Sequence, residues 1–389
     1  MSAFPVDLQR LPPDVSAMGI STGFVSAGFE PVRETFERNF EEGRELGASF
    51  AAYLGDELIV DLRGGHADRR AEQPWNERTL CPIYSTTKPV SALVVAMLVD
   101  KGLVDYDKPL ADYWPEFGVE GKDVFTVAEA LSHQAGVPGF LEPIDPDLWL
   151  DPPALSAALA KLKPLWGKGE GSGYHPLTWG YIAGELVRRV SGRTLGTVLR
   201  EDVCAPLGID FYIGTPDSEH GRCAQMMKPK EPTQFGARND ALKAAFLTPW
   251  AAPQRGGAEW RRAEIPSANG HGTARAVARL FSAYALKGRI GEMRVISAAT
   301  WEQLTRERVS GPDRILPGPV TFAAGVMRNE TFLYGPNPKT LWHSGWGGSG
   351  GFGDPDTKLS GAYIMNRQGT HLLEDNRRTR IIDALYGCL

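Results

Sequence analysis

Several kinds of segment are missing from this sequence of 389 residues. The longest apolar run lies within residues 90–99 and is too short to cross a bilayer. Residues 1–15 contain Asp7, Arg10 and three prolines, without the basic start and apolar stretch of a signal peptide. No run of like charges occurs and the formal net charge is -5, which disfavours nucleic acid and anionic membranes as partners. We therefore expect a soluble, cytoplasmic globular protein.

Cysteine is scarce, and no cluster of potential metal ligands stands out. The four cysteines are far apart in the sequence and include no Cys-x-x-Cys pair, which predicts free thiols in a reducing compartment. The His-Glu-x-x-His pattern is missing, and no group of cysteines and histidines has the spacing of metal ligands. The sequence accordingly predicts neither a metal ion nor another cofactor.

Ser85 and Lys88 stand at the head of a strongly apolar helical segment. Apolar residues recur there at the i, i+3, i+4, i+7 and i+8 positions, the spacing of a helix that buries one face. These positions are Val90, Leu93, Val94, Met97 and Leu98. Pro89 is tolerated only near a first turn, so the helix is expected to begin near Ser85, with Lys88 one turn away on the same face. A lysine held beside a serine in an apolar setting can lose its proton and serve as a base.

Patterning elsewhere predicts a chain with strands near both ends and helices between them. Strands are expected over residues 48–54, 57–63, 320–327, 341–344 and 359–365, and helices over residues 30–45, 155–162, 178–190, 273–286, 297–305 and 372–385. Residues 1–28 show little periodicity, and residues 208–270 are expected to form long loops that shape a pocket mouth. The pattern predicts one antiparallel sheet built from both ends of the chain and flanked by helices, a fold of the α/β class and α+β type. Residues 1–105 and 286–389 are expected to form the sheet domain, and residues 106–285 a mostly helical inserted domain.

The pattern Gly-x-Ser-x-Gly occurs twice, around Ser21 and around Ser349. A nucleophile elbow needs a strand before the serine and a helix directly after it. The first copy lies in the N-terminal lead and the second in a glycine-rich turn between strands, and neither has the helix. We interpret both as turn chemistry, with Ser349 as the second choice of nucleophile after Ser85.

Ser-x-x-Lys alone is a common pattern, but here it stands first in an ordered set of motifs. The set comprises residues 84–88 (YSTTK), 105–110 (DYDKPL), 131–136 (LSHQAG), 171–176 (GSGYHP) and 342–348 (WHSGWGG). In this order the motifs resemble the serine β-lactamase and penicillin-binding-protein superfamily. Within it, the likeness is closest to the class-C-lactamase-like carboxylesterases called family VIII, and it extends from about residue 30 to the C-terminus. The resemblance implies a serine β-lactamase-like fold.

The resemblance also implies roles for individual residues. Ser85 matches the acylated nucleophile, Lys88 the lysine that helps to take its proton, and Tyr174 a second proton-relay group. In such enzymes the oxyanion hole consists of two backbone N–H groups, which here would be those of Ser85 and Trp346.

The strand motif carries the remaining expected contacts to substrate. His343 and Gly345 occupy the first and third positions where lactamases have Lys-Thr-Gly, so both are expected to line the substrate site. Trp346 follows as an apolar wall for a short acyl or alcohol group.

Two departures from the family pattern bear on the substrate. Pro176 replaces the asparagine of Tyr-x-Asn, which removes an amide that contacts a lactam side chain. His343 replaces the lysine of Lys-Thr-Gly, so a permanent positive charge is missing, because an unperturbed histidine is mostly neutral at pH 7. Both changes weaken recognition of anionic β-lactams more than ester hydrolysis. Purely structural readings stay open as well: a surface lysine at position 88, a core aromatic at 174, a structural histidine at 343 and a packing tryptophan at 346.

The sequence therefore predicts a carboxylesterase that cleaves short-chain esters through an acyl-serine. Its partner would be a small-molecule ester, and the oligomeric state is left open. One alternative is a β-lactamase or D-alanyl peptidase-like activity. The other is a catalytically silent binding protein on the same scaffold.

Overall fold

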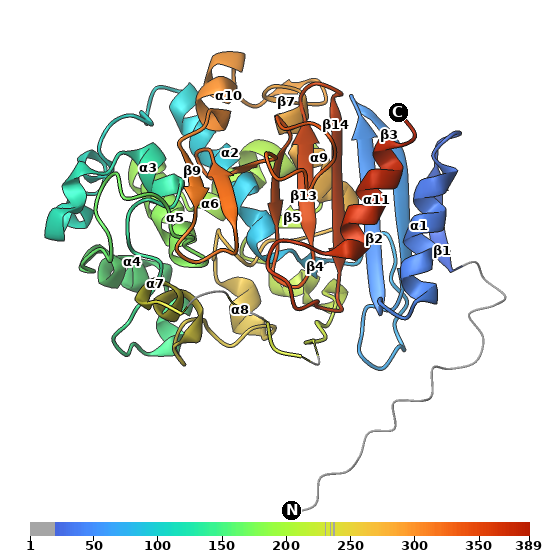
Figure 1. Cartoon of the computed structure of the whole chain (residues 1–389), viewed down its shortest axis with the longest axis horizontal. Helices are drawn as coiled ribbons and strands as arrows, with labels where there is room; N and C mark the ends of the chain where they lie inside the picture. Colours follow the sequence, from blue (N-terminus) through green and yellow to red (C-terminus); the bar gives the residue numbers. More distant parts are fainter. Residues whose placement is uncertain (1–19, 230, 234, 236–237) are drawn as a thin grey trace, which may run out of the picture.

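The computed structural model describes residues 20–229, 231–233, 235 and 238–389. Its centre is a nine-stranded antiparallel sheet in the order β1-β3-β2-β14-β13-β12-β11-β10-β9 (Figure 1). The strands are β1 Ser21–Val25, β2 Gly47–Leu54, β3 Glu57–Gly65, β9 Val309–Pro312, β10 Pro319–Phe322, β11 Met327–Arg328, β12 Leu341–Ser344, β13 Gly350–Asp354 and β14 Leu359–Met365. In the middle of the sheet β2 pairs with β14, in a register that sets Ala51 opposite Ala362. The predicted antiparallel sheet from both ends of the chain is thus confirmed.

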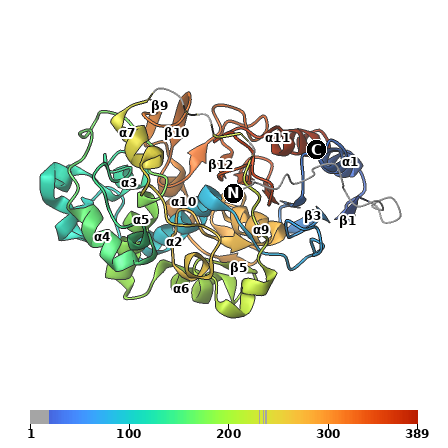
Figure 2. The ribbon, with the colours of Figure 1, turned by 90° about the horizontal axis from the view of Figure 1, so that it is seen from below.

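Helices cover both faces of the sheet. Helices α1 (Glu30–Glu41) and α11 (Asn376–Tyr386) pack together on one face, and α9 (Ala274–Ala285) packs on the other, against β2, β13 and β14 (Figure 2). Each of these helices buries an apolar stripe, such as Ile381, Ile382 and Leu385 in α11. The sheet is therefore the middle of three layers.

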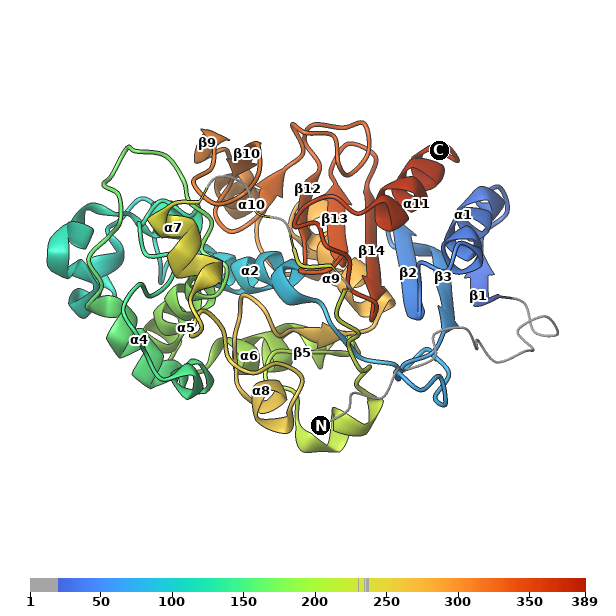
Figure 3. The same ribbon diagram turned by 60° about the horizontal axis from the view of Figure 1, so that its bottom comes forward.

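The remaining helices form a region beside the sheet, in which α2 is enclosed (Figure 3). The further helices are α2 Thr87–Asp100, α3 Val127–Leu131, α4 Pro152–Ala160, α5 Thr178–Ser191, α6 Leu195–Leu199, α7 Asp240–Leu242, α8 Ala258–Arg262 and α10 Ala298–Thr305. Two small sheets, β4-β6-β5 and β7-β8, join loops around them, with β4 Cys81–Pro82, β5 Phe211–Tyr212, β6 His271–Gly272, β7 Arg289–Ile290 and β8 Met293–Arg294. Helix α2 packs against α5, α6 and α10, so it links this helical region to the sheet through β12 and α9.

Most predicted elements occur within a few residues of their expected bounds, but three predictions are wrong. The strand expected over residues 320–327 is a hairpin of β10 and β11, because Gly325 turns the chain with φ +96°. A Cβ at Gly325 would lie only 2.6 Å from the Trp179 ring, so the turn is fixed by packing on α5. Within residues 1–28, expected to lack structure, residues 21–25 form the edge strand β1, which pairs with β3; residues 1–19 lie outside the described part.

The third error concerns the glycine-rich stretch at residues 347–351, which was expected to be only a turn. Strand β13 begins within it, at Gly350. A Cβ at Gly350 would collide with the Tyr334 hydroxyl and one at Gly351 with the Phe281 ring, on opposite faces of the strand. Glycine is needed here because neighbouring side chains approach a central strand closely, and not because the chain turns.

Among the described residues, no helix is both long and apolar enough to cross a membrane. All four cysteines are free thiols. The division of the chain at residues 105 and 285 stays a prediction.

Candidate active site

Ser85 lies in a short 3₁₀ turn, Tyr84–Thr86, that leads directly into α2. Tyr84, the residue before it, has a left-handed backbone with φ +47°, which is rare for a residue with a bulky side chain. Neighbouring hydrogen bonds hold the turn: the Ile83 N–H donates to the Gly270 carbonyl at 2.9 Å, and the Gly270 N–H donates to Thr87 Oγ1 at 3.0 Å. The result is a fixed turn that leaves Ser85 partly exposed beside a pocket.

Lys88 is fully buried, with its amine 3.3 Å from Ser85 Oγ. The same nitrogen lies 2.8 Å from the Pro176 carbonyl oxygen and 3.2 Å from the Ser267 carbonyl oxygen. Burial holds the pKa of Lys88 well below its usual value. A neutral amine has two N–H donors for the two carbonyls and one lone pair for the Ser85 hydroxyl. The geometry therefore suits a lysine that accepts the serine proton.

Tyr174 completes the group of three predicted catalytic residues. Lys88 Nζ lies 4.7 Å from the centre of the Tyr174 ring. Burial raises the pKa of the Tyr174 phenol, although a hydrogen bond with the Ser85 side chain works in the other direction. The phenol is therefore protonated and can donate, while the neighbouring amine accepts.

Sequence reasoning missed Asp313, whose carboxylate fixes the Tyr174 segment. Asp313 Oδ1 accepts from the Tyr174 N–H at 3.0 Å, and Oδ2 accepts from Ser172 Oγ at 2.7 Å. The Ile315 and Leu316 N–H groups also donate to Asp313 Oδ1. Because 139 residues separate Asp313 from Tyr174, no local pattern could have revealed the contact.

Two buried histidines, His133 and His175, also hold the segment that carries Tyr174. The His175 N–H donates to His133 Nδ1 at 3.0 Å, and His175 Nε2 accepts from the Val137 N–H at 3.0 Å. His175 Nδ1 donates to the Gly173 carbonyl at 2.6 Å. Burial lowers the pKa of His175 to about 3, so the ring is neutral and bonded at both nitrogens. The two rings thus position the loop that carries Tyr174.

His343 on β12 faces the same pocket, with its ring 5.9 Å from that of Tyr174. Its Nδ1 donates to the Ser344 carbonyl at 2.7 Å, which leaves Nε2 as an acceptor. Nε2 is buried and has no hydrogen-bond partner among the described residues. Burial lowers the pKa of His343 to about 3, and the nearby Lys88 contributes. A neutral His343 ring agrees with the loss of positive charge expected at this position from the sequence.

The turn after β12 presents the Trp346 N–H group. Inside the turn, the Gly345 N–H donates to the Ser349 carbonyl at 2.7 Å and the Gly348 N–H donates to the Gly345 carbonyl at 3.0 Å. Since the Gly345 carbonyl points into the turn, the N–H of the same planar peptide, that of Trp346, points outward. The described backbone hydrogen bonds include none donated by the N–H of Ser85 or of Trp346. Among the described residues neither N–H group has a backbone partner, which suits the oxyanion role predicted for them.

Gly345 is packed so tightly that no larger side chain fits. A Cβ at this position would overlap Ser349 Oγ and the Ile83 carbonyl oxygen. Ser349 is buried, and its hydroxyl donates to the Ile83 carbonyl at 2.8 Å. The hydroxyl of Ser349, the second choice of nucleophile, therefore links the turn that carries Ser85 to the turn that carries Trp346.

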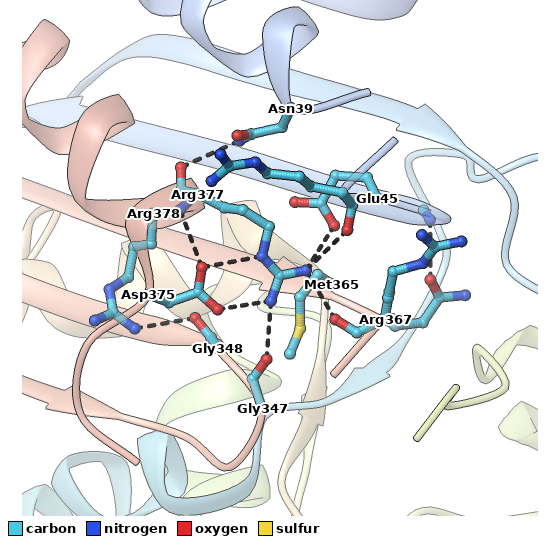
Figure 4. Close-up of polar contacts among 12 residues, drawn as sticks. Asn39, Glu45, Gly347, Gly348, Met365, Arg367, Asp375, Arg377 and Arg378 are labelled. Atoms are coloured by element: carbon cyan, nitrogen blue, oxygen red, sulfur yellow. Dashed lines mark hydrogen bonds and ion pairs between the residues drawn. The ribbon is translucent and has the colours of Figure 1, made fainter. Parts of the chain in front are cut away.

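Two arginines at the start of α11 hold the outer side of this turn (Figure 4). Arg377 donates to the Gly347 carbonyl at 3.0 Å, and Arg378 donates to the carbonyls of Gly348 and Ser349 at 3.0 and 3.3 Å. Arg377 also forms ion pairs with Asp375 at 2.6 Å and with Glu45 at 3.1 Å (Figure 4). We name Arg377 and Arg378 the arginine clamp.

Ser85 opens into a pocket of about 300 Å³ with a mainly apolar and aromatic wall. The predicted site residues Ser85, Tyr174, His343 and Trp346 line it. Lys88 lies behind the wall, and Gly345, which was also expected to line the site, is not part of the lining. The Trp346 ring packs against Phe246, with ring centres 5.6 Å apart. Residues between 208 and 270 contribute much of the lining, partly from loops and partly from short helical segments such as α8, which carries Trp260. They are Pro232, Thr233, Phe235, Ala245, Phe246, Ala251, Ala252, Pro253, Arg255, Trp260 and Ala268. A larger cavity of about 600 Å³ between α4, α5 and α8 contains none of the predicted site residues.

A central antiparallel sheet, a helical region beside it and a Ser-x-x-Lys pair at the head of a buried helix define the serine β-lactamase-like class of proteins. The sequence profile of the Beta-lactamase family matches residues 32–386, and the chain belongs to this family. The resemblance found in the sequence motifs is thereby confirmed.

Three similar proteins extend this result. The esterase/beta-lactamase LipL of Mycobacterium tuberculosis is 34% identical over 361 residues, which are 89% of this chain and 82% of LipL. A penicillin-binding protein homologue from Caulobacter crescentus is 52% identical with a TM-score of 0.93, over 95% of this chain and 100% of that one. A family VIII carboxylesterase is 41% identical with a TM-score of 0.88, again over 95% and 100%.

Proposed function

We propose that the protein is a carboxylesterase that hydrolyses short-chain esters through an acyl-Ser85 intermediate. The observation that carries the proposal is the buried Lys88 amine, which lies 3.3 Å from Ser85 Oγ and has two backbone carbonyls for its own N–H groups. Similar proteins described as an esterase/beta-lactamase and as a carboxylesterase support the choice of reaction.

Acylation follows from the positions of these groups. Lys88 takes the proton of Ser85 as Oγ attacks the ester carbonyl. The N–H groups of Ser85 and Trp346 stabilise the negative oxygen that forms, each contributing on the order of 3 kcal/mol. Tyr174 protonates the departing alkoxide and recovers a proton from the Lys88 ammonium, which leaves acyl-Ser85 and a neutral amine.

Deacylation uses the same groups in the reverse order. Tyr174 takes a proton from water as the water attacks the acyl carbonyl, and passes its own phenol proton to the Lys88 amine. The same two N–H groups stabilise the second oxyanion. The proton returns to Ser85 Oγ as the acid leaves.

Esters are favoured over β-lactams by two residues of the pocket wall. His343 is neutral and presents an acceptor, so it offers no charge to a lactam carboxylate. Pro176 has no side-chain amide, and its carbonyl already accepts from Lys88. An alkoxide also needs less assistance to leave than an amine.

Ester and lactam hydrolysis can be compared in one panel. We expect p-nitrophenyl acetate and butyrate to be hydrolysed, and a chromogenic cephalosporin to be turned over poorly. Ser85→Ala should abolish ester hydrolysis and labelling by a fluorophosphonate probe. Ser21 lies in the first Gly-x-Ser-x-Gly copy, on the edge strand β1. Ser21→Ala is the matched control and should keep full activity.

Three results would contradict the proposal. If neither substrate is turned over, the scaffold serves binding alone. Efficient cephalosporin turnover with poor ester turnover would make the protein a β-lactamase. Full esterase activity in Ser85→Ala would move the nucleophile elsewhere, with Ser349 as the first residue to test.

A further inference from the structure

Arg255 is the one lysine, arginine, aspartate or glutamate among the described residues that line the Ser85 pocket. Its guanidinium carbon lies 5.3 Å from the centre of the Trp346 ring and 5.9 Å from that of Tyr84. Tyr84 directly precedes Ser85, and Trp346 carries the proposed oxyanion donor. The cation is therefore held over two rings that flank the reacting position.

Within the described part of the chain, the Arg255 side chain takes part in no hydrogen bond and no ion pair, although a guanidinium has five N–H donors. Arg262, seven residues further on, makes two bonds to Asp217, at 2.6 and 2.9 Å. Rings that pack against the face of a guanidinium leave its N–H edges open. Arg255 is thus an exposed cation, packed on two rings, whose donors face no acceptor among the described residues.

The surrounding pocket makes that charge distinctive. His343, the other basic side chain in the lining, is neutral and acts as an acceptor. Most of the wall is aliphatic or aromatic, whereas the Arg255 side chain itself is exposed, so water partly screens an anion that pairs with it. The fork of a single guanidinium fits the two oxygens and the single charge of a carboxylate. A phosphate dianion would keep a net negative charge in the same apolar setting.

We propose that Arg255 forms an anion subsite that binds a carboxylate carried by the ester substrate. This inference rests on the proposed esterase function and adds the substrate class: esters that bear a carboxylate away from the scissile bond, on either the acyl or the alcohol side. The positive charge that the family pattern has on β12 is then replaced by one from the loop before α8, which packs on the Trp346 ring.

Matched esters test the subsite directly. For the acyl side, we would compare the p-nitrophenyl monoester of adipic acid with the same ester whose free carboxyl group is a primary amide. For the alcohol side, we would compare 4-acetoxybenzoate with 4-acetoxybenzamide. The native protein should show a kcat/KM roughly tenfold higher for the carboxylate in at least one pair, the factor of one charge-assisted hydrogen bond. Raising the salt from 20 to 500 mM should reduce this preference.

Arg255→Gln should remove the preference and leave kcat/KM for the amide ester within about twofold of the native value. Arg255→Lys should keep part of it, since the charge remains and the fork is lost. Arg261→Gln, on the neighbouring α8 and outside the pocket lining, is the control and should keep the full preference. Equal kcat/KM for acid and amide in both pairs, or a preference that survives in Arg255→Gln, would overturn the inference.

A binding measurement separates this inference from the proposed function. Calorimetry should show that the native protein binds benzoate more tightly than benzamide, and that Arg255→Gln does not. If the native protein hydrolyses no ester yet shows this difference, the subsite stands and the esterase proposal fails. If it hydrolyses neutral esters and binds both compounds alike, the esterase proposal stands and the subsite fails.

Discussion

Lys88 is the residue on which the proposed chemistry depends, and its environment is made by packing. Desolvation alone lowers its pKa, because α2 places the amine in the interior among backbone carbonyls. The same desolvation raises the pKa of the neighbouring Tyr174 phenol. One physical cause therefore makes a base of the amine and keeps the phenol as an acid.

The protonation of Lys88 should be visible in the pH profile. A lowered pKa means that the neutral amine predominates at a lower pH, so kcat/KM should rise with pH through an apparent pKa well below 10.5. Lys88→Met should lower kcat by about 10²–10⁴-fold and remove this rise. Ester hydrolysis between pH 5 and 10, measured with thermal unfolding of each variant, checks both effects.

Lys122 offers a matched control, because it is another buried lysine. Its amine donates to the carbonyls of Val119 and Leu162 and contacts no serine. Lys122→Met should lower the unfolding temperature without changing the pH profile. Equal losses of activity in the two variants would favour a structural role for Lys88.

At the scale of elements, the site is the meeting place of α2, β12 and α11. The turn after β12 is closed by its own hydrogen bonds, tied to the Ser85 turn through Ser349, and held from outside by the arginine clamp. Because α11 begins at the clamp, the last helix of the chain determines where the Trp346 N–H points.

Loosening the clamp should impair catalysis more than binding. Arg378→Met removes three donated bonds, to the carbonyls of Gly348, Ser349 and Leu373, without leaving a carboxylate unpaired. We expect kcat to fall roughly tenfold while KM changes less than threefold, since an oxyanion donor acts mainly in the transition state. Steady-state kinetics on p-nitrophenyl butyrate measure both constants.

Arg380→Met serves as the control on the same helix. Arg380 bonds to Asn39 and Glu42 of the neighbouring segment and makes no contact with the turn. It should lose some stability and keep its kcat. A fall in kcat that matches the loss of folded protein in both variants would mean that the clamp only supports the fold.

At the scale of the whole molecule, buried histidines should govern the response to acid. Burial lowers the pKa of His175, His271 and His343 to about 3. Below an unfolded pKa near 6.5, the unfolded chain takes up protons that the folded chain refuses, so stability is lost as the pH falls. Each histidine contributes about 1.4 kcal/mol per pH unit.

Glu45 acts in the opposite direction. Burial raises its pKa to about 7, so its protonation favours the folded state as the pH falls from 7 toward 4.5. The pKa of buried His133 is lowered as well. Four histidines outweigh one glutamate, and the unfolding free energy should fall by on the order of 4 kcal/mol per pH unit between pH 6.5 and 4.5. Urea unfolding at several pH values measures this slope, which His271→Phe should reduce by about a third. A free energy of unfolding that is constant from pH 7 to 5 would contradict neutral buried histidines.

Local patterns predicted most of the elements that carry the site. The i, i+3 spacing of Ser85 and Lys88, the apolar stripe after them and the hairpin of β2 and β3 all depend on neighbours within a few residues. The motif order predicted the family, and of the residues that it marked, Ser85, Tyr174, His343 and Trp346 line one pocket. The glycines of β13 were misjudged because their cause, close approach by Phe281 and Tyr334, lies far away in the sequence.

The sequence by itself determined the helix that begins near Ser85 and the missing positive charge at His343, since residue type and short-range periodicity are enough for these. Only the tertiary structure decided that Lys88 is desolvated, that Asp313 fixes Tyr174, that the arginine clamp aims the Trp346 N–H, and that Arg255 stands over the pocket with open donors. Desolvation and charge pairing arise between segments that are brought together by folding, so they have no signature in the local order of residues.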